Sequence, residues 1–135
     1  MNEKLKKCKE DIITEIKAAF FNTQNIPSII ILINNNYESF LIPAGDIVRA
    51  KEDINKVREN NSEILVFFYV SMIVIKDEIK VAIAESYNNK NLKVSIFDNN
   101  NGVLVLNKRE SEIQTKNIVK KEKNKSGFPF LFSNN

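Results

Sequence analysis

The chain has 135 residues, of which 43% are hydrophobic and 27% are charged, and its formal net charge at pH 7 is +3. These values suit one globular domain of ordinary size and exclude a chain that is disordered throughout. The absence of histidine excludes histidine-based acid–base catalysis, histidine-activated nucleophiles and ordinary zinc sites. Gly45, Gly102 and Gly127 are too scattered to form a phosphate-binding loop. We therefore expect no catalytic residue, no metal site, no cofactor and no enzymatic activity.

The composition also bears on the compartment and the source. Lysine, asparagine and isoleucine are abundant while arginine is scarce, which is typical of an AT-rich genome. Cys8 is the single cysteine, so no intramolecular disulfide is expected. The charged N-terminus does not resemble a signal peptide, and the longest apolar run, residues 64–75, falls short of the roughly 20 residues that span a bilayer. We expect a cytoplasmic protein that does not enter a membrane.

The first half of the chain predicts a helix, a β-hairpin and a second helix. Apolar residues recur at helical spacing over residues 3–21, where Cys8 is expected to be a small core residue. Residues 26–33 and 37–42 are extended and apolar, with the asparagines between them expected to take positive φ angles in the turn. Asp46 precedes a second helix as its N-cap, and the expected buried stripe consists of Ile47, Ala50, Ile54 and Val57.

The following residues predict a β-meander. Residues 64–75 suit a central strand buried on both faces, although their length also allows a buried helix. Further strands are expected over residues 79–87, 92–97 and 103–106. The predicted fold class is α+β: helix–β-hairpin–helix–β-meander, an antiparallel sheet of about five strands with helices packed on one face. Residues 1–107 form the predicted single domain.

Residues 108–135 predict a basic tail that ends in an apolar segment. Residues 108–125 carry seven basic and three acidic side chains, and Ile113, Ile118 and Val119 predict one weakly amphipathic helix. The apolar segment consists of Phe128, Phe130, Leu131 and Phe132. Three interpretations remain open: the segment packs on its own core, it binds a protein partner or sister subunit, or the tail binds nucleic acid. The last would use Lys116, Lys120, Lys121, Lys123 and Lys125.

Two other features could carry function. Residues 92–97 and the short strand after Gly102 are expected to form a sheet edge, with Lys93 as its protective charge, and an open edge favours strand pairing and homodimers. The Glu78-Ile79-Lys80 triplet matches the Glu-x-Lys element of restriction-type nucleases, which also needs a second acid; Glu63 and Asp77 are the candidates. We expect a non-catalytic protein-binding module (adaptor, inhibitor or assembly factor) acting through the sheet edge and the Phe-rich tail. The alternative is a nucleic-acid-binding accessory protein or a small metal-dependent nuclease.

Overall fold

The computed structural model describes residues 3–60, 63–87 and 90–123, with the backbone alone at 90–91 and 121–123. Three helices and six strands follow one another in the predicted order. They are α1 (Glu3–Thr23), β1 (Ile29–Asn34), β2 (Ser39–Pro43), α2 (Ile47–Asn60), β3 (Ile64–Ile75), β4 (Glu78–Tyr87), β5 (Lys90–Asn100), β6 (Val103–Leu106) and α3 (Lys108–Lys123).

The six strands form one antiparallel sheet in the order β2-β1-β3-β4-β5-β6. The predicted α+β class is confirmed, and the sheet has six strands where about five were expected. Residues 64–75 form a strand and not a buried helix, and they pair with β1 on one side and β4 on the other. Helix α2 connects the end strand β2 to β3, so that β1 lies between the two strands that α2 joins.

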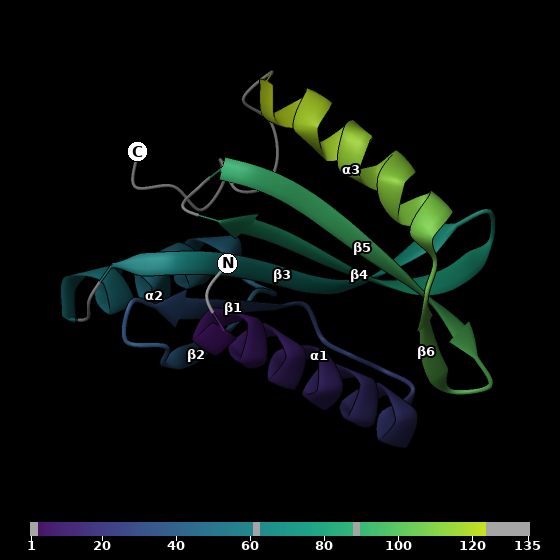
Figure 1. The fold of residues 1–135 in the computed structure, drawn as a ribbon, viewed down its shortest axis with the longest axis horizontal. Helices are drawn as coiled ribbons and strands as arrows, with labels where there is room; N and C mark the ends of the chain where they lie inside the picture. Colours follow the sequence, from purple (N-terminus) through teal and green to yellow (C-terminus); the bar gives the residue numbers. More distant parts are fainter. Residues whose placement is uncertain (1–2, 61–62, 88–89, 124–135) are drawn as a thin grey trace.

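The helices cover both faces of the sheet, which corrects the expectation that they pack on one face. Helix α1 lies on one side of the strands, and α3 lies along β5 on the other (Figure 1). Alternate residues of β1 separate accordingly: Ile31 and Ile33 pack in the core under α1, while Ile30 and Leu32 pack in the core under α2. A strand in which every residue is apolar cannot leave either face in water, so both faces need a cover.

The turns use positive φ angles at fewer asparagines than expected. In the β1–β2 turn the residue at φ 62° is Tyr37, whereas Asn34 is fully buried. The Asn34 side chain accepts hydrogen bonds from the backbone N–H groups of Asn36 and Glu38 and donates to the Glu38 carboxylate. Between β5 and β6, Asn101 and Gly102 take φ angles of 54° and 90°, the pattern of a two-residue hairpin turn.

Side chains of α1 attach this helix to the sheet. Lys9 forms an ion pair with Glu85 of β4 at 2.5 Å, and both side chains are largely buried. Cys8 is half-buried against the same core, as its place on the apolar stripe predicted, and its Sγ lies 3.8 Å from the carbonyl oxygen of Tyr37. Among the residues that the structure describes, no helix is both long and apolar enough to cross a bilayer.

Candidate functional site

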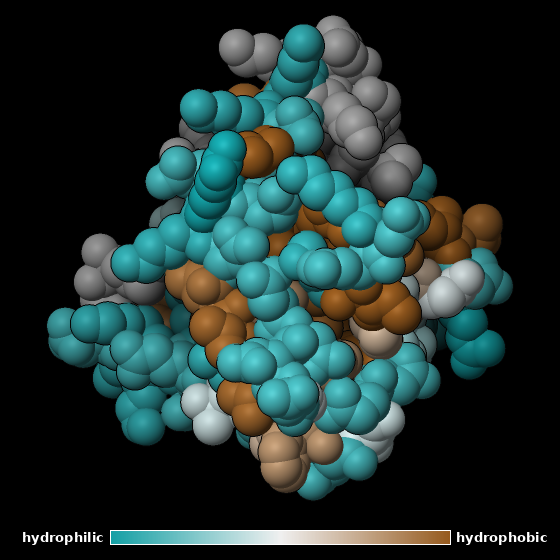
Figure 2. Space-filling model, turned by 90° about the vertical axis from the view of Figure 1, so that its right-hand side faces the viewer, coloured by the Kyte–Doolittle hydropathy of each residue, from teal (hydrophilic) through white to brown (hydrophobic). Residues whose placement is uncertain are grey.

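Strand β6 ends the sheet and exposes an apolar surface. The exposed fractions of Val103, Val105 and Leu106 are 51%, 46% and 45%, and the strand contains no charged or polar residue. Figure 2 looks onto the end of the molecule that carries β6, where brown apolar side chains interrupt the polar surface. Strand β6 is short, with four residues, but it has no charge, proline or bulge, three features that usually prevent pairing with another strand.

The backbone of β6 also faces outward at alternate residues. The N–H of Asn107 donates to the carbonyl oxygen of Ile96 at 2.8 Å, and the register pairs Phe97 with Leu106. Because hydrogen-bonded and non-hydrogen-bonded pairs alternate in an antiparallel ladder, the backbone N–H and C=O groups of Leu104 and Leu106 point away from β5. These are the groups that an added strand would use.

The outer edge of β5, which was expected to be open over residues 92–97, is covered by α3. The N–H of Val94 donates to Thr115 Oγ1 at 2.9 Å, and the N–H of Ile96 donates to Ser111 Oγ at 2.8 Å. Two hydroxyls one helical turn apart therefore satisfy successive outward groups of the strand. The prediction of an open edge is therefore wrong for this part of β5, because α3 lies where a neighbouring strand would pair. The same prediction is confirmed for β6, which ends the sheet.

The opposite end strand, β2, is less suited to pairing. It ends at Pro43, which has no backbone N–H to donate. Glu38 precedes it directly and places a charge beside its first residue. Proline and charge at an end strand disfavour the addition of another strand. Of the two end strands, β6 is therefore the better candidate for a binding edge.

A hollow of about 360 Å³ lies between α3 and the face of strands β3, β4 and β5. Its floor is apolar and comes from three strands: Ile73 of β3, Ala82 and Ala84 of β4, and Val94 and Ile96 of β5. The two alanines leave the space because their side chains end at Cβ. The volume falls in the range of about 300–1,000 Å³ that is usual for binding pockets.

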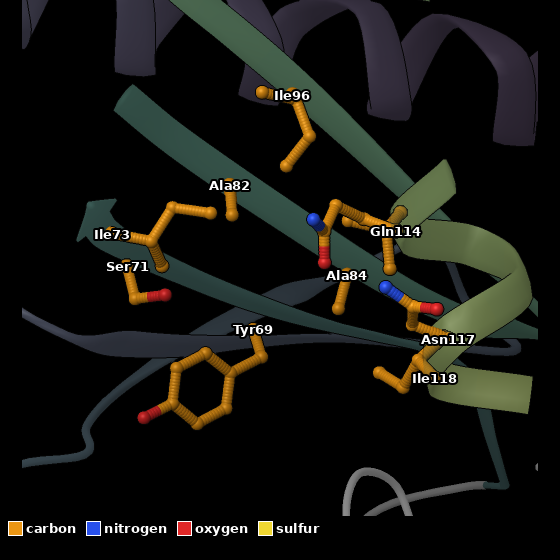
Figure 3. Close-up of a pocket in the computed structure, with 10 residues that line it drawn as sticks. Tyr69, Ser71, Ile73, Ala82, Ala84, Ile96, Gln114, Asn117 and Ile118 are labelled. Carbon is orange, nitrogen blue, oxygen red and sulfur yellow. The ribbon is translucent and has the colours of Figure 1, made fainter. Parts of the chain in front are cut away.

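The rim of this hollow is polar. Gln114 and Asn117 reach from α3 toward the strands, and the hydroxyl groups of Ser71 and Tyr69 lie on the opposite side (Figure 3). Ile118, in the last turns of α3, lines one end of the hollow. Amide and hydroxyl groups around an apolar floor can hydrogen-bond the backbone of a bound segment while the floor receives its side chains.

The Glu78–Lys80 pair lies on the same face, beyond the floor of the hollow, and belongs to an ion-pair cluster. Lys80 Nζ donates to Asp98 at 2.6 Å and to Glu78 at 3.3 Å, and Lys80 is only 8% exposed. The hydrogen bond to Asp98 raises the pKa of Lys80 above its ordinary value; the bond to Glu78 also raises it, and burial opposes both. Lys80 therefore stays an ammonium ion at neutral pH and cannot accept a proton there.

The residues named as the second acid of a nuclease site do not join this cluster. Glu63 directly precedes β3, whereas Glu78 pairs with the last residue of that 12-residue strand, so about 40 Å separates them along it. Asp77 lies in the β3–β4 turn at φ 68°. The acid that contacts Lys80 is Asp98, which lies in β5 one residue beyond the strand predicted over residues 92–97. In the described part of the chain, no three acidic or cysteine side chains are placed to bind one metal ion.

The residues predicted to bind a partner lie mostly outside the part of the chain that the structure describes. Phe128, Phe130, Leu131 and Phe132 lie outside it, as does Lys125. Lys116 and Lys120 are exposed on α3, and Lys121 and Lys123 belong to its last turn. The boundary predicted at residue 107 stays a prediction, but α3 packs on β5 directly after it.

Sequence interpretation missed the contribution of α3 to the sheet. Ser111, Thr115, Gln114 and Asn117 were not named, although Ser111 and Thr115 are spaced as neighbours on one helix face. That spacing could have predicted the contact with β5, because small hydroxyl residues one helical turn apart can hydrogen-bond an adjacent strand.

Comparisons with known proteins add no relative to these observations. No protein-family model, no curated protein and no solved structure matches the chain.

Proposed function

We propose that the protein is a non-catalytic, cytoplasmic protein-binding module, an adaptor, inhibitor or assembly factor, whose partner adds a strand to β6. The observation that carries the proposal is the uncharged end strand with three exposed aliphatic side chains, Val103, Val105 and Leu106. The Phe-rich segment of residues 128–132 is the second surface of this proposal. A second copy of the chain is one partner that β6 would accept, which would join two sheets edge to edge.

The proposal is supported by the backbone groups and the apolar side chains that β6 exposes along the same edge. Strand addition provides backbone hydrogen bonds for affinity and alternate side-chain contacts for specificity. In β6 the outward backbone groups belong to Leu104 and Leu106, and Val103 and Val105 are exposed on the face that carries α3. On this side of the sheet, the closure of β5 by Thr115 and Ser111 limits the open edge to β6, which defines where a partner strand would begin.

Two substitutions test the proposal without disturbing the sheet. Val105→Lys places a charge on the edge, opposite Asp98, so the hairpin itself tolerates it. Leu106→Pro removes an outward N–H, a position at which end strands accept proline. Val48→Lys is the matched control, since Val48 is an exposed valine on α2. Proteins captured from the native host are identified, and self-association is measured by analytical ultracentrifugation.

The expected result is one defined association, with a partner or with a second copy, that survives Val48→Lys and is lost in both β6 variants. An association that is equally strong in all four proteins would contradict the role of β6. A native chain that is monomeric and captures nothing would contradict the proposal as a whole. Circular dichroism of each variant confirms that the fold persists.

The alternative function, nucleic-acid binding, has one observation in its favour. Lys116 and Lys120 are exposed four residues apart on α3, so they share one helix face. Two such lysines would contact neighbouring phosphates, and the affinity would fall steeply with salt because counterions are released. Gel shifts at low and moderate salt, with the native chain and with Lys116→Glu/Lys120→Glu, test this alternative.

A further inference from the structure

We propose that the hollow beside α3 is the docking site of the chain's own apolar segment, Phe128 to Phe132. Two features of the molecule meet here: an apolar floor that the described helices leave uncovered, and an apolar segment that follows the helix forming one wall. Only the release of the segment to a partner rests on the proposed function. The docking itself is tested by measurements that do not involve β6.

The floor fits aromatic side chains. Ala82 and Ala84 supply depth, and Ile73, Val94 and Ile96 supply apolar contact on both sides of them. Phenylalanine buries about 150–250 Å² when it enters such a site. The four apolar side chains of the segment would otherwise present a contiguous apolar surface to water.

The rim fits the backbone of the same segment. A peptide that crosses an apolar floor must keep its N–H and C=O groups hydrogen-bonded. The amides of Gln114 and Asn117 provide donors and acceptors on the α3 side, and the Ser71 hydroxyl does so on the β3 side (Figure 3). Both kinds of contact are thus available to an extended segment lying between α3 and β3.

The chain length allows the segment to reach the hollow. Ile118 lines the hollow and α3 ends at Lys123, five residues later, which is about 7.5 Å of helix. The four residues 124–127 span up to about 13 Å when extended, and Gly127 allows the chain to reverse. Phe128 can therefore return to the level of Ile118. A segment tethered this closely has an effective concentration of millimolar order, which favours it over an untethered competitor.

Docking would control when the segment meets a partner. While it occupies the hollow, its phenylalanines face the molecule's own sheet, and a partner of the segment must first displace it. The affinity measured for such a partner would equal the intrinsic affinity multiplied by the fraction of chains in which the segment is released. Strand addition at β6 would be unaffected, because β6 lies outside the residues that line the hollow.

Disulfide formation in the full chain tests the docking. Cys8→Ala removes the native thiol, and Ser71→Cys with Phe130→Cys then places one thiol in the hollow and one in the segment. Leu41→Cys with Phe130→Cys is the control, because Leu41 is exposed on β2 at the far end of the sheet. At micromolar protein, we expect a cross-linked monomer with Ser71→Cys that forms several-fold faster than with Leu41→Cys. Equal rates, or a cross-linked dimer in place of the monomer, would overturn the proposal; the dimer would assign the hollow to a second copy.

The fluorescence of a dye that binds apolar surface gives a second test, because docked and exposed phenylalanines predict different changes in fluorescence when they are replaced. In Phe128→Ser/Phe130→Ser/Phe132→Ser the segment no longer fills the hollow, so dye fluorescence should rise several-fold. If the phenylalanines are instead exposed in the native chain, their removal leaves the fluorescence unchanged or lowers it, and the proposal fails. Neither measurement depends on β6, so the proposed function can fail while the docking holds, and the reverse.

Discussion

The hydroxyl oxygen of Thr115 in α3 lies 2.9 Å from the amide nitrogen of Val94 in β5 and 3.1 Å from the carbonyl oxygen of the same residue. One side chain therefore meets both polar groups that this strand residue would offer to a neighbouring strand. Ser111, one turn earlier, accepts from the N–H of Ile96. The helix thereby closes most of the edge of β5 and leaves β6 as the open end of the sheet.

The first prediction concerns this closure. Thr115→Val keeps the shape of the side chain and leaves the N–H of Val94 without its acceptor. We expect the free energy of unfolding to fall by about 1–3 kcal/mol, the usual cost of an unsatisfied buried group. Urea denaturation measures the change, and exchange of the Val94 amide proton should accelerate. Thr115→Ser retains the hydroxyl and should lose clearly less; a loss in Thr115→Val that is no larger than in Thr115→Ser would contradict the leading role of the hydroxyl.

The second prediction concerns the start of α3. Asn107 Oδ1 accepts from the N–H of Glu110 at 2.9 Å, and Asn107 Nδ2 donates to Asp98 at 3.1 Å. Asn107→Ala should lower stability by about 0.5–2 kcal/mol because the helix loses its N-cap. Asn107→Ser keeps a capping oxygen and should lie between the native chain and the alanine variant in thermal denaturation. Identical melting temperatures for the serine and alanine variants would contradict the capping role.

The third prediction concerns the pH dependence that Lys80 confers. The folded-state pKa of Lys80 lies above its ordinary value of 10.5, so protonation favours the folded state. The stability that Lys80 contributes is therefore fully present below pH 10.5 and is lost as the pH rises through the folded-state pKa. We expect Lys80→Met to cost about 1.5 kcal/mol at pH 7, the low end for hydrogen bonds to charged groups, because Asp98 is 42% exposed in its side chain.

Urea denaturation of the native chain and of Lys80→Met from pH 7 to 11 measures this contribution as a difference, which removes the effect of other titrating groups. The difference should be constant up to about pH 10 and shrink above it. In an Asp98→Asn background, Lys80 loses the partner that raises its pKa most, so the difference should be smaller and its decline should end at lower pH. A difference that grows with pH would contradict the assigned direction.

The fourth prediction concerns the β5–β6 turn. Gly102 has a φ of 90°, and a Cβ placed there would lie 2.7 Å from Gln24 Nε2. Gly102→Ala should lower stability by about 1–3 kcal/mol through backbone strain, because the flexible Gln24 side chain can move away. The same substitution in a Gln24→Ala background separates the two causes. Most of the cost should persist there, and its disappearance would assign the effect to the contact with Gln24.

The element order could be predicted from the sequence because each element has a local cause. Seven apolar residues recur at helical spacing in α1: Leu5, Ile12, Ile16 and Phe20 are buried, Cys8 and Ile13 are half-buried, and Ala19 is exposed. In α2 the prediction was less accurate: Ala50 and Ile54 are buried, whereas Ile47 is 38% exposed in the first turn. Residues at a helix start project beyond the packed face, which periodicity alone does not reveal.

The placement of helices on both faces of the sheet could have been predicted from the sequence of β1. A run such as Ile29–Ile33 has no polar residue to face water, so it implies a helix on each face. The candidate site was harder to predict because it depends on contacts between distant residues. Asp98 lies 18 residues from Lys80, and Thr115 lies 21 residues from Val94. Only the register of the sheet and the docking of α3 bring these pairs together.

The sheet's cover on both faces has a consequence for folding in the cell. Four consecutive residues of β1, Ile30 to Ile33, are buried, and Phe67 and Phe68 lie beside them in β3. Uncharged β-branched and aromatic stretches of this kind self-associate when they are exposed. Until α1 and α2 have closed over them, a newly synthesised chain carries two such stretches, so variants that loosen either helix should be lost to aggregation before equilibrium unfolding can be measured.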